Sequence, residues 1–171
     1  AKSLIKNLGA ALEQTRDLEQ SYRSVALFYK NTEEQKIKNS NTKTKLMTVR
    51  NGYHGDTFHA MSVCDPDTGM HSLYQGILPE QYFAPAPQTP FGAPLMQDDT
   101  AEIEAILEKN HNNIAAIILE PVIQGAGGMR MYSAEHLDEL VGIAHKYDVI
   151  CVADEVMTGF GRTGKDFACL H

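Results

Sequence analysis

The chain has 171 residues, and its hydrophobic fraction of 43% and charged fraction of 22% are ordinary for a soluble globular domain with its own core. The formal net charge of −7 argues against nucleic-acid and anionic-membrane partners, because both attract a basic patch. No apolar run approaches the length of a membrane span, and the N-terminus lacks the hydrophobic segment of a signal peptide. Three cysteines, an odd number without metal-ligand spacing, favour a reducing, cytoplasmic compartment.

The first half of the chain gives weak periodic signals. Apolar residues at roughly helical spacing predict a helix over residues 1–30, and the polar stretch 31–45 reads as a helix end followed by a loop. A short strand is expected at 46–49. Residues 51–98 hold most of the prolines and predict long structured loops with a short helix near 57–63. Their aromatic content argues against disorder.

The second half alternates helices and strands. The pattern predicts a helix over 99–110, an apolar strand over 114–121 and a second apolar strand over 149–155. Between the strands, Ser133 is expected to cap a helix with apolar residues at positions i, i+3, i+4 and i+7. Strands that are apolar throughout indicate an α/β fold with a mainly parallel sheet and helices on both faces. Ligands bind such sheets outside the carboxyl ends of the strands.

Residues 149–164 (VICVADEVMTGFGRTG) end in a literal G-x-G-x-x-G, the pattern of a dinucleotide-binding turn. Five residues (154–158) lie between the apolar run of the strand and Gly159, whereas a pyrophosphate site needs its first glycine directly after the strand. The carboxylates of Asp154 and Glu155 would repel a pyrophosphate, and no long helical pattern follows the glycines. The sequence therefore disfavours a nicotinamide-nucleotide module, although it does not exclude one.

A carboxylate at a strand end suits a different cofactor. Pyridoxal phosphate acts as an electron sink while its ring nitrogen stays protonated, and a fixed carboxylate stabilises that charge. Asp154 holds such a position, and a strand would point Val156 to the same side, where it could pack against the ring. A plain polar strand terminus is the commoner explanation of such an acid.

Three stretches carry a resemblance to a known family: residues 51–66 (NGYHGDTFHAMSVCDP), 116–132 (AIILEPVIQGAGGMRMY) and 152–169 (VADEVMTGFGRTGKDFAC). Together they resemble the class III pyridoxal-phosphate-dependent aminotransferases. The resemblance covers residues 46–171 and implies a partial large domain of a fold-type I transferase, preceded by a divergent segment over residues 1–45. It also implies pyridoxal 5'-phosphate as cofactor, small-molecule substrates and a homodimer.

Within this family, the resemblance is strongest to the branch that works in biotin synthesis. Asp56 stands where generic members carry arginine, and residues 70–76 and 83–87 also match that branch. The resemblance implies transfer of an amino group from S-adenosylmethionine to 8-amino-7-oxononanoate. Two alternatives stay open, namely another class III ω-aminotransferase and a non-catalytic fragment that needs a partner chain.

The resemblance also implies residue roles at the cofactor. Asp154 matches the aspartate that pairs with the pyridine nitrogen. Tyr53 matches the aromatic residue that lies against the ring and lines the substrate site. Val156 matches the residue on the opposite ring face. Ser24 falls in the family's phosphate-binding turn. Arg23 replaces the glycine expected in that turn, which puts the phosphate site in question.

Further roles concern the surroundings of the cofactor. Glu120 matches the acid that ends the preceding strand and is taken as support, while Asp56 and Arg162 are expected to lie together near the substrate. His54 and Gly55 complete the turn of Tyr53. Scattered loop histidines are usually solvated, and no Cys/His cluster indicates a metal.

The family's catalytic lysine lies a few tens of residues beyond the Gly-Arg-Thr-Gly motif, past His171. The sequence therefore contains no residue assigned as catalytic. We expect this chain alone to have no transaminase activity and, with sheet edges unpaired, to be poorly stable.

Overall fold

The computed structural model describes residues 43–68, 73–74 and 76–171, so the helix expected over 1–30 and all but the last three residues of the polar stretch 31–45 lie outside the described residues. Residues 43–171 form one compact unit. Its centre is a four-stranded parallel sheet in the order β2-β1-β3-β6. The strands are β1 (Lys45–Val49), β2 (Tyr82–Ala84), β3 (Ile114–Leu119) and β6 (Ile150–Ala153).

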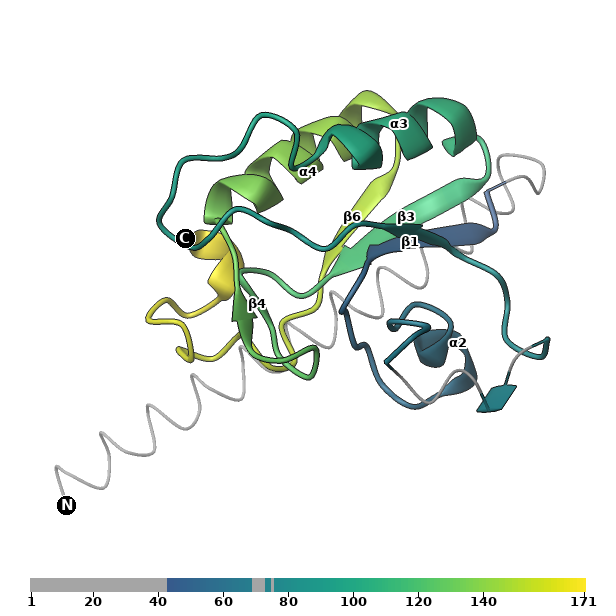
Figure 1. The fold of residues 1–171 in the computed structure, drawn as a ribbon, viewed down its shortest axis with the longest axis horizontal. Helices are drawn as coiled ribbons and strands as arrows, with labels where there is room; N and C mark the ends of the chain where they lie inside the picture. Colours follow the sequence, from purple (N-terminus) through teal and green to yellow (C-terminus); the bar gives the residue numbers. More distant parts are fainter. Residues whose placement is uncertain (1–42, 69–72, 75) are drawn as a thin grey trace, which may run out of the picture. The chain divides into compact units, whose positions relative to one another are not determined.

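Helices α3 (Ala101–Asn110) and α4 (Ala134–Lys146) lie over the same face of this sheet (Figure 1). They connect β2 to β3 and β3 to β6, two crossovers that run in the same direction across the sheet. Right-handed crossovers in one direction place their helices on one face. The connection from β1 to β2 runs the opposite way, and its short helix α2 (Phe58–Met61) lies on the opposite face. The α/β architecture predicted from the apolar strands is thus confirmed.

The core lies between the sheet and the two long helices. Side chains alternate along β1, so that Met47 and Val49 enter this core while Thr48 faces the other side of the sheet. Leu140, at the middle of α4, is fully buried against the same cluster. Both faces of β3 are covered, and this explains why its sequence, Ile114 to Leu119, is apolar throughout.

A second, smaller element follows β3. Strands β4 (Ile123–Gln124) and β5 (Arg130–Met131) form an antiparallel hairpin. This hairpin and β2 were not predicted, because strands of two or three residues carry too few positions to show a period. The 3₁₀ helix η2 (Ala168–Leu170) ends the described chain. Within the described part of the chain, no helix is long and apolar enough to cross a membrane.

The predicted capping role of Ser133 is wrong in its chemistry. Ser133 does occupy the position before α4 with an extended backbone, but its side chain makes no capping hydrogen bond. Its hydroxyl donates instead to the carbonyl oxygen of Ala93, at 3.3 Å. The side chain therefore ties α4 to the loop before α3, a long-range contact that local sequence spacing does not reveal.

Candidate functional site

The carboxyl ends of β1, β3 and β6 meet at one edge of the sheet, since the three strands are parallel and adjacent. The turn after β1 carries Tyr53 and His54, while Glu120 follows β3 and Asp154 follows β6. The backbone N–H of Asp154 donates to the carbonyl oxygen of Leu119, at 2.8 Å, and thereby continues the pairing of β3 with β6. Side chains 100 residues apart along the chain thus become neighbours.

Asp154 is paired with His54. The imidazole Nδ1 lies 2.7 Å from Oδ2 of the carboxylate, and the side chains of His54 and Asp154 are 1% and 14% exposed. Because a carboxylate only accepts, Nδ1 donates this bond. On the far side of the ring, Nε2 lies 3.4 Å from the hydroxyl of Thr48. The expectation that His54 is solvated, as loop histidines usually are, is therefore wrong.

Glu120 supports the turn that carries Tyr53. Its Oε2 accepts the backbone N–H of Tyr53 at 3.3 Å, and its Oε1 accepts the backbone N–H of Gly125 at 3.0 Å. Burial raises the pKa of this carboxyl, and the charge of Asp154 adds to the increase, while the two backbone donors oppose it. Glu120 thus links the turn after β1 to the loop after β3.

Tyr53 and Asp56 form a pair at the surface of this site. The Tyr53 hydroxyl donates to Oδ1 of Asp56, and the tyrosine side chain stays 38% exposed. This hydrogen bond raises the pKa of the Tyr53 hydroxyl, because the phenolate would lose the bond and meet a second negative charge. Because Tyr53 remains partly exposed, a ligand can still reach it.

Two buried polar side chains hold the same turn from outside the site. Oδ2 of Asp65 accepts the backbone N–H of Asn51 at 2.7 Å, and Nε2 of Gln124 donates to the carbonyl oxygen of Arg50 at 2.7 Å. Asn51 adopts a left-handed backbone with φ of 64°, which turns the chain away from β1. Gly127 packs so closely that an added Cβ would lie 1.9 Å from the Asn51 carbonyl oxygen.

Val156 is presented by a turn rather than by a strand. Strand β6 ends at Ala153, and Oδ1 of Asp154 accepts the backbone N–H of Val156 at 3.1 Å. The alternation argument that placed both side chains on one side of a strand is therefore wrong, since an aspartate at a strand end bonds its own following backbone. Val156 is 90% exposed, so its apolar surface lies open beside Asp154.

The glycine motif does not form a dinucleotide-binding turn. Turns and bends follow Gly159, Gly161 and Gly164, and the next helical element is η2, three residues long. A pyrophosphate site needs a full helix N-terminus directly after the glycines. Arg162, within this motif, is exposed and forms no ion pair with Asp56 among the described residues.

The arrangement fits the ring of pyridoxal phosphate. A carboxylate held by a buried histidine can bind a protonated ring nitrogen, and Tyr53 and Val156 expose apolar surface that could contact the ring. Ser24, expected at the phosphate, lies outside the described residues. No cluster of three potential metal ligands occurs in the part of the chain that the structure describes.

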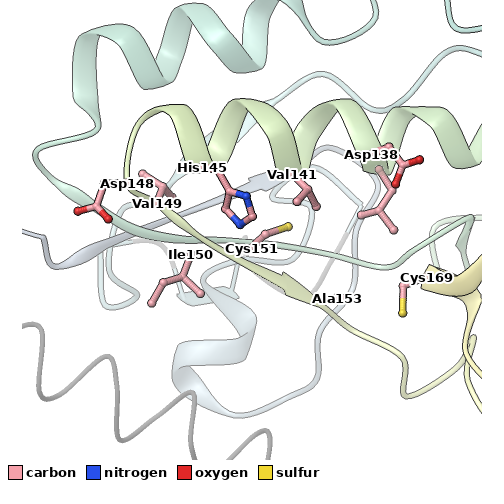
Figure 2. A pocket seen from close by; sticks show the side chains of 10 residues that line it. Asp138, Val141, His145, Asp148, Val149, Ile150, Cys151, Ala153 and Cys169 are labelled. Atoms are coloured by element: carbon pink, nitrogen blue, oxygen red, sulfur yellow. The ribbon is translucent and has the colours of Figure 1, made fainter.

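A groove of about 530 Å³ lies elsewhere, along β6 and α4 (Figure 2). Val141 and His145 of α4 and Cys151 of β6 line it, whereas Tyr53, His54 and Asp154 do not. Burial raises the pKa of the Cys151 thiol to about 12, so this thiol is a poor nucleophile. We therefore place the functional site at the carboxyl edge of the sheet, where titratable groups converge.

Analysis of the sequence placed His54 in the turn of Tyr53 but missed its pairing with Asp154. The feature that could have pointed to this pairing is the position of His54 shortly after a strand. That position becomes informative only once β1 is known to lie beside β3 and close to β6. Strand order in a parallel sheet is a tertiary property, because the crossover connections allow several orders.

Comparison with protein families gives one match across most of the chain. The family model described as Aminotransferase class-III matches residues 18–171. The match begins before residue 46, where the motifs begin, and so includes Ser24.

Among curated relatives, the adenosylmethionine-8-amino-7-oxononanoate aminotransferase of Corynebacterium glutamicum is 48% identical over 129 residues, which make up 75% of this chain and 30% of the relative. The protein of the same name from Saccharomyces cerevisiae is 44% identical over 138 residues, 75% of this chain and 29% of the relative.

Comparison with solved structures also finds aminotransferases. The adenosylmethionine-8-amino-7-oxononanoate aminotransferase of Methanocaldococcus jannaschii superposes with a TM-score of 0.72 at 32% identity, over 82% of this chain and 30% of that chain. An omega transaminase from Pseudomonas jessenii in complex with PMP superposes with a TM-score of 0.66 at 28% identity, over 88% of this chain and 34% of that chain. The chain thus spans about three tenths of the length of these relatives.

Proposed function

The chain belongs to the class III aminotransferase family, and from this premise we propose that it forms part of the cofactor-binding domain of a pyridoxal-phosphate-dependent aminotransferase. The observation that carries the proposal is the pairing of Asp154 with the buried imidazole of His54 at the carboxyl end of β6. Relatives named as aminotransferases, one of them solved in complex with PMP, support it.

Each residue of the site has a role in this proposal. Pyridoxal phosphate, when bound, supplies an electron sink for charge that develops on the substrate. Asp154 would hold the ring nitrogen and keep its proton in place, while His54 fixes the orientation of the carboxylate and covers its back from water. Tyr53 and Val156 would contact the two ring faces, and Ser24 would bind the phosphate.

We further propose that the amino group moves from S-adenosylmethionine to 8-amino-7-oxononanoate. The names of the curated relatives support this choice of substrates. Asp56 and Arg162 are the residues proposed to contact substrate. Asp56 is held beside the Tyr53 hydroxyl, and its negative charge suits an amino group, whereas the exposed guanidinium of Arg162 suits a carboxylate.

Cofactor binding tests the proposal. Pyridoxal phosphate is titrated into the protein at its full encoded length, and the absorbance of the bound cofactor is followed. Asp154→Asn should raise the Kd at least about tenfold, because it removes a charged hydrogen bond worth about 1.5–3 kcal/mol. Asp138→Asn changes an exposed carboxylate on α4 and should leave the Kd unchanged. Equal affinity of wild type and Asp154→Asn would contradict the proposed role.

The amino donor separates the leading function from its alternative. If the biotin-pathway reaction is correct, S-adenosylmethionine should convert the bound cofactor to its amino form, whereas ω-amino donors should not. The reverse preference would favour another class III ω-aminotransferase, a class to which the Pseudomonas jessenii structure belongs. A homodimer and a cytoplasmic location complete the proposal, and sedimentation and cell fractionation test them.

A further inference from the structure

Glu155 follows Asp154 directly but faces away from the proposed cofactor site. Its Oε2 accepts the hydroxyl of Thr158 at 2.7 Å and the backbone N–H of Ala168 at 3.0 Å, and its Oε1 accepts the backbone N–H of Cys169 at 2.8 Å. One carboxylate therefore joins the end of β6 to the start of η2, 13 and 14 residues further along the chain. Neither the proposed chemistry nor the glycine motif accounts for this arrangement.

These bonds close the segment 156–167 into a loop, which we call the glycine loop. The backbone adds to the closure, because the carbonyl oxygen of Glu155 accepts the N–H of Gly159 at 3.0 Å. An added Cβ on Gly159 would lie 2.9 Å from that oxygen, so only glycine allows this approach. Within the loop, the N–H of Gly161 donates to the carbonyl oxygen of Asp166 at 3.1 Å. The glycines thus shape a closed surface loop rather than a phosphate cradle.

The carboxylate is suited to hold this loop shut. Both of its oxygens accept, and hydrogen bonds to an ionised acceptor are about twice as strong as those between neutral groups. The backbone N–H groups of Ala168 and Cys169 are donors that no preceding turn of helix satisfies, since they open η2. Thr158 is fully buried, so its hydroxyl needs this acceptor.

The glycine loop begins at Val156 and carries Arg162 near its middle, two residues that the proposed function uses. We propose that Glu155 is a positioning residue, which orders the glycine loop and thereby sets where Val156 and Arg162 are presented to cofactor and substrate. This inference rests on the proposed function for its consequence in binding. The ordering of the loop itself does not depend on any ligand.

The first test measures loop order without cofactor. In Glu155→Gln, one oxygen is replaced by a donor, so at least one N–H of η2 loses its acceptor. Amide exchange at Ala168 and Cys169 should then quicken on the order of tenfold, the effect of losing one charged hydrogen bond. Glu102→Gln, an exposed change in the first turn of α3, is the matched control. Thr158→Val removes only one of the three donors and should give a smaller effect.

Cys169 provides a second readout, at a side chain that lies directly beside Glu155. Burial of the sulfur, the hydrogen bond to Glu155 and the charge of Glu155 together raise the pKa of the Cys169 thiol to about 11. Glu155→Gln should shift the pH profile of Cys169 alkylation to lower pH, followed by mass spectrometry of its peptide. Unchanged exchange and an unchanged alkylation profile would overturn the inference, whether or not the protein binds cofactor.

The binding consequence is tested on protein that passes the cofactor titration. Glu155→Gln should raise the Kd of pyridoxal phosphate and the KM of the carboxylate substrate several-fold, while kcat at saturating cofactor stays within about twofold. Equal losses in kcat and thermal stability with no change in KM or Kd would reduce Glu155 to a structural residue and overturn its positioning role. Failure of the wild type to bind cofactor would refute the proposed function alone, and loop order would still be decided by the first test.

Discussion

Replacing Gly127 by alanine tests how tightly the turn of Tyr53 is held. The new Cβ would lie 1.9 Å from the carbonyl oxygen and 2.9 Å from the carbonyl carbon of Asn51, both backbone atoms. Asn51 cannot yield freely, because its N–H is bound by Asp65 and the preceding carbonyl by Gln124. Overpacking of this kind costs about 1–3 kcal/mol. Alanine recovers about 0.4–1 kcal/mol through the unfolded chain, so the midpoints of the two ranges leave a net loss of about 1 kcal/mol.

Equilibrium urea unfolding at the protein's full encoded length measures this difference. Gly142 supplies the control, since it lies exposed within α4 and an added Cβ meets nothing within 4 Å. Gly142→Ala should therefore stabilise the fold by about 0.5–1 kcal/mol. The two alanine variants make the same chemical change and are expected to shift the free energy of unfolding in opposite directions.

The displacement should also reach the site. Tyr53 and His54 follow Asn51 directly, so a shifted turn would weaken the contact of His54 with Asp154 and raise the Kd of pyridoxal phosphate. Stability of Gly127→Ala equal to or above that of the wild type would show that the two loops are not in close contact, and the account of the turn would then be wrong.

Two pH-dependent results are also expected. Burial lowers the pKa of His136 below its usual 6.5, against the attraction of Asp99, so the unfolded chain binds more protons than the folded one. The contribution of His136 to stability is complete above pH 6.5 and is lost as the pH falls toward the pKa of the folded state. His136→Gln should therefore weaken the dependence of the unfolding free energy on pH in this range. An unchanged pH dependence would contradict the role given to His136. Asp56→Asn should lower the pKa of Tyr53 toward 10.0 in a spectrophotometric titration of the tyrosines. The titration step that disappears in Tyr53→Phe identifies Tyr53. If that step does not move in Asp56→Asn, the hydrogen bond between Tyr53 and Asp56 is excluded.

The parallel sheet and its helices were predictable because they follow from local periodicity. The apolar runs at Ile114–Leu119 and Ile150–Ala153 predicted two strands, of which β3 is buried and β6, at the edge of the sheet, is only partly so. The spacing of Leu137, Leu140 and Ala144 predicted α4. The acids Glu120 and Asp154 were expected within the last residues of strands over 114–121 and 149–155, whereas the strands end one residue before them, at Leu119 and Ala153. These properties depend only on residues close together in sequence.

The partners of these acids were not predictable in the same way. Asp154 and Glu155 are adjacent carboxylates at the end of one strand, yet the first binds His54 from the turn after β1 and the second binds the backbone of η2. Which side chain meets which depends on strand order and on the path of the loops, and these are set by packing across the whole sheet. Local composition thus specified an acidic edge, and folding gave its two carboxylates different partners.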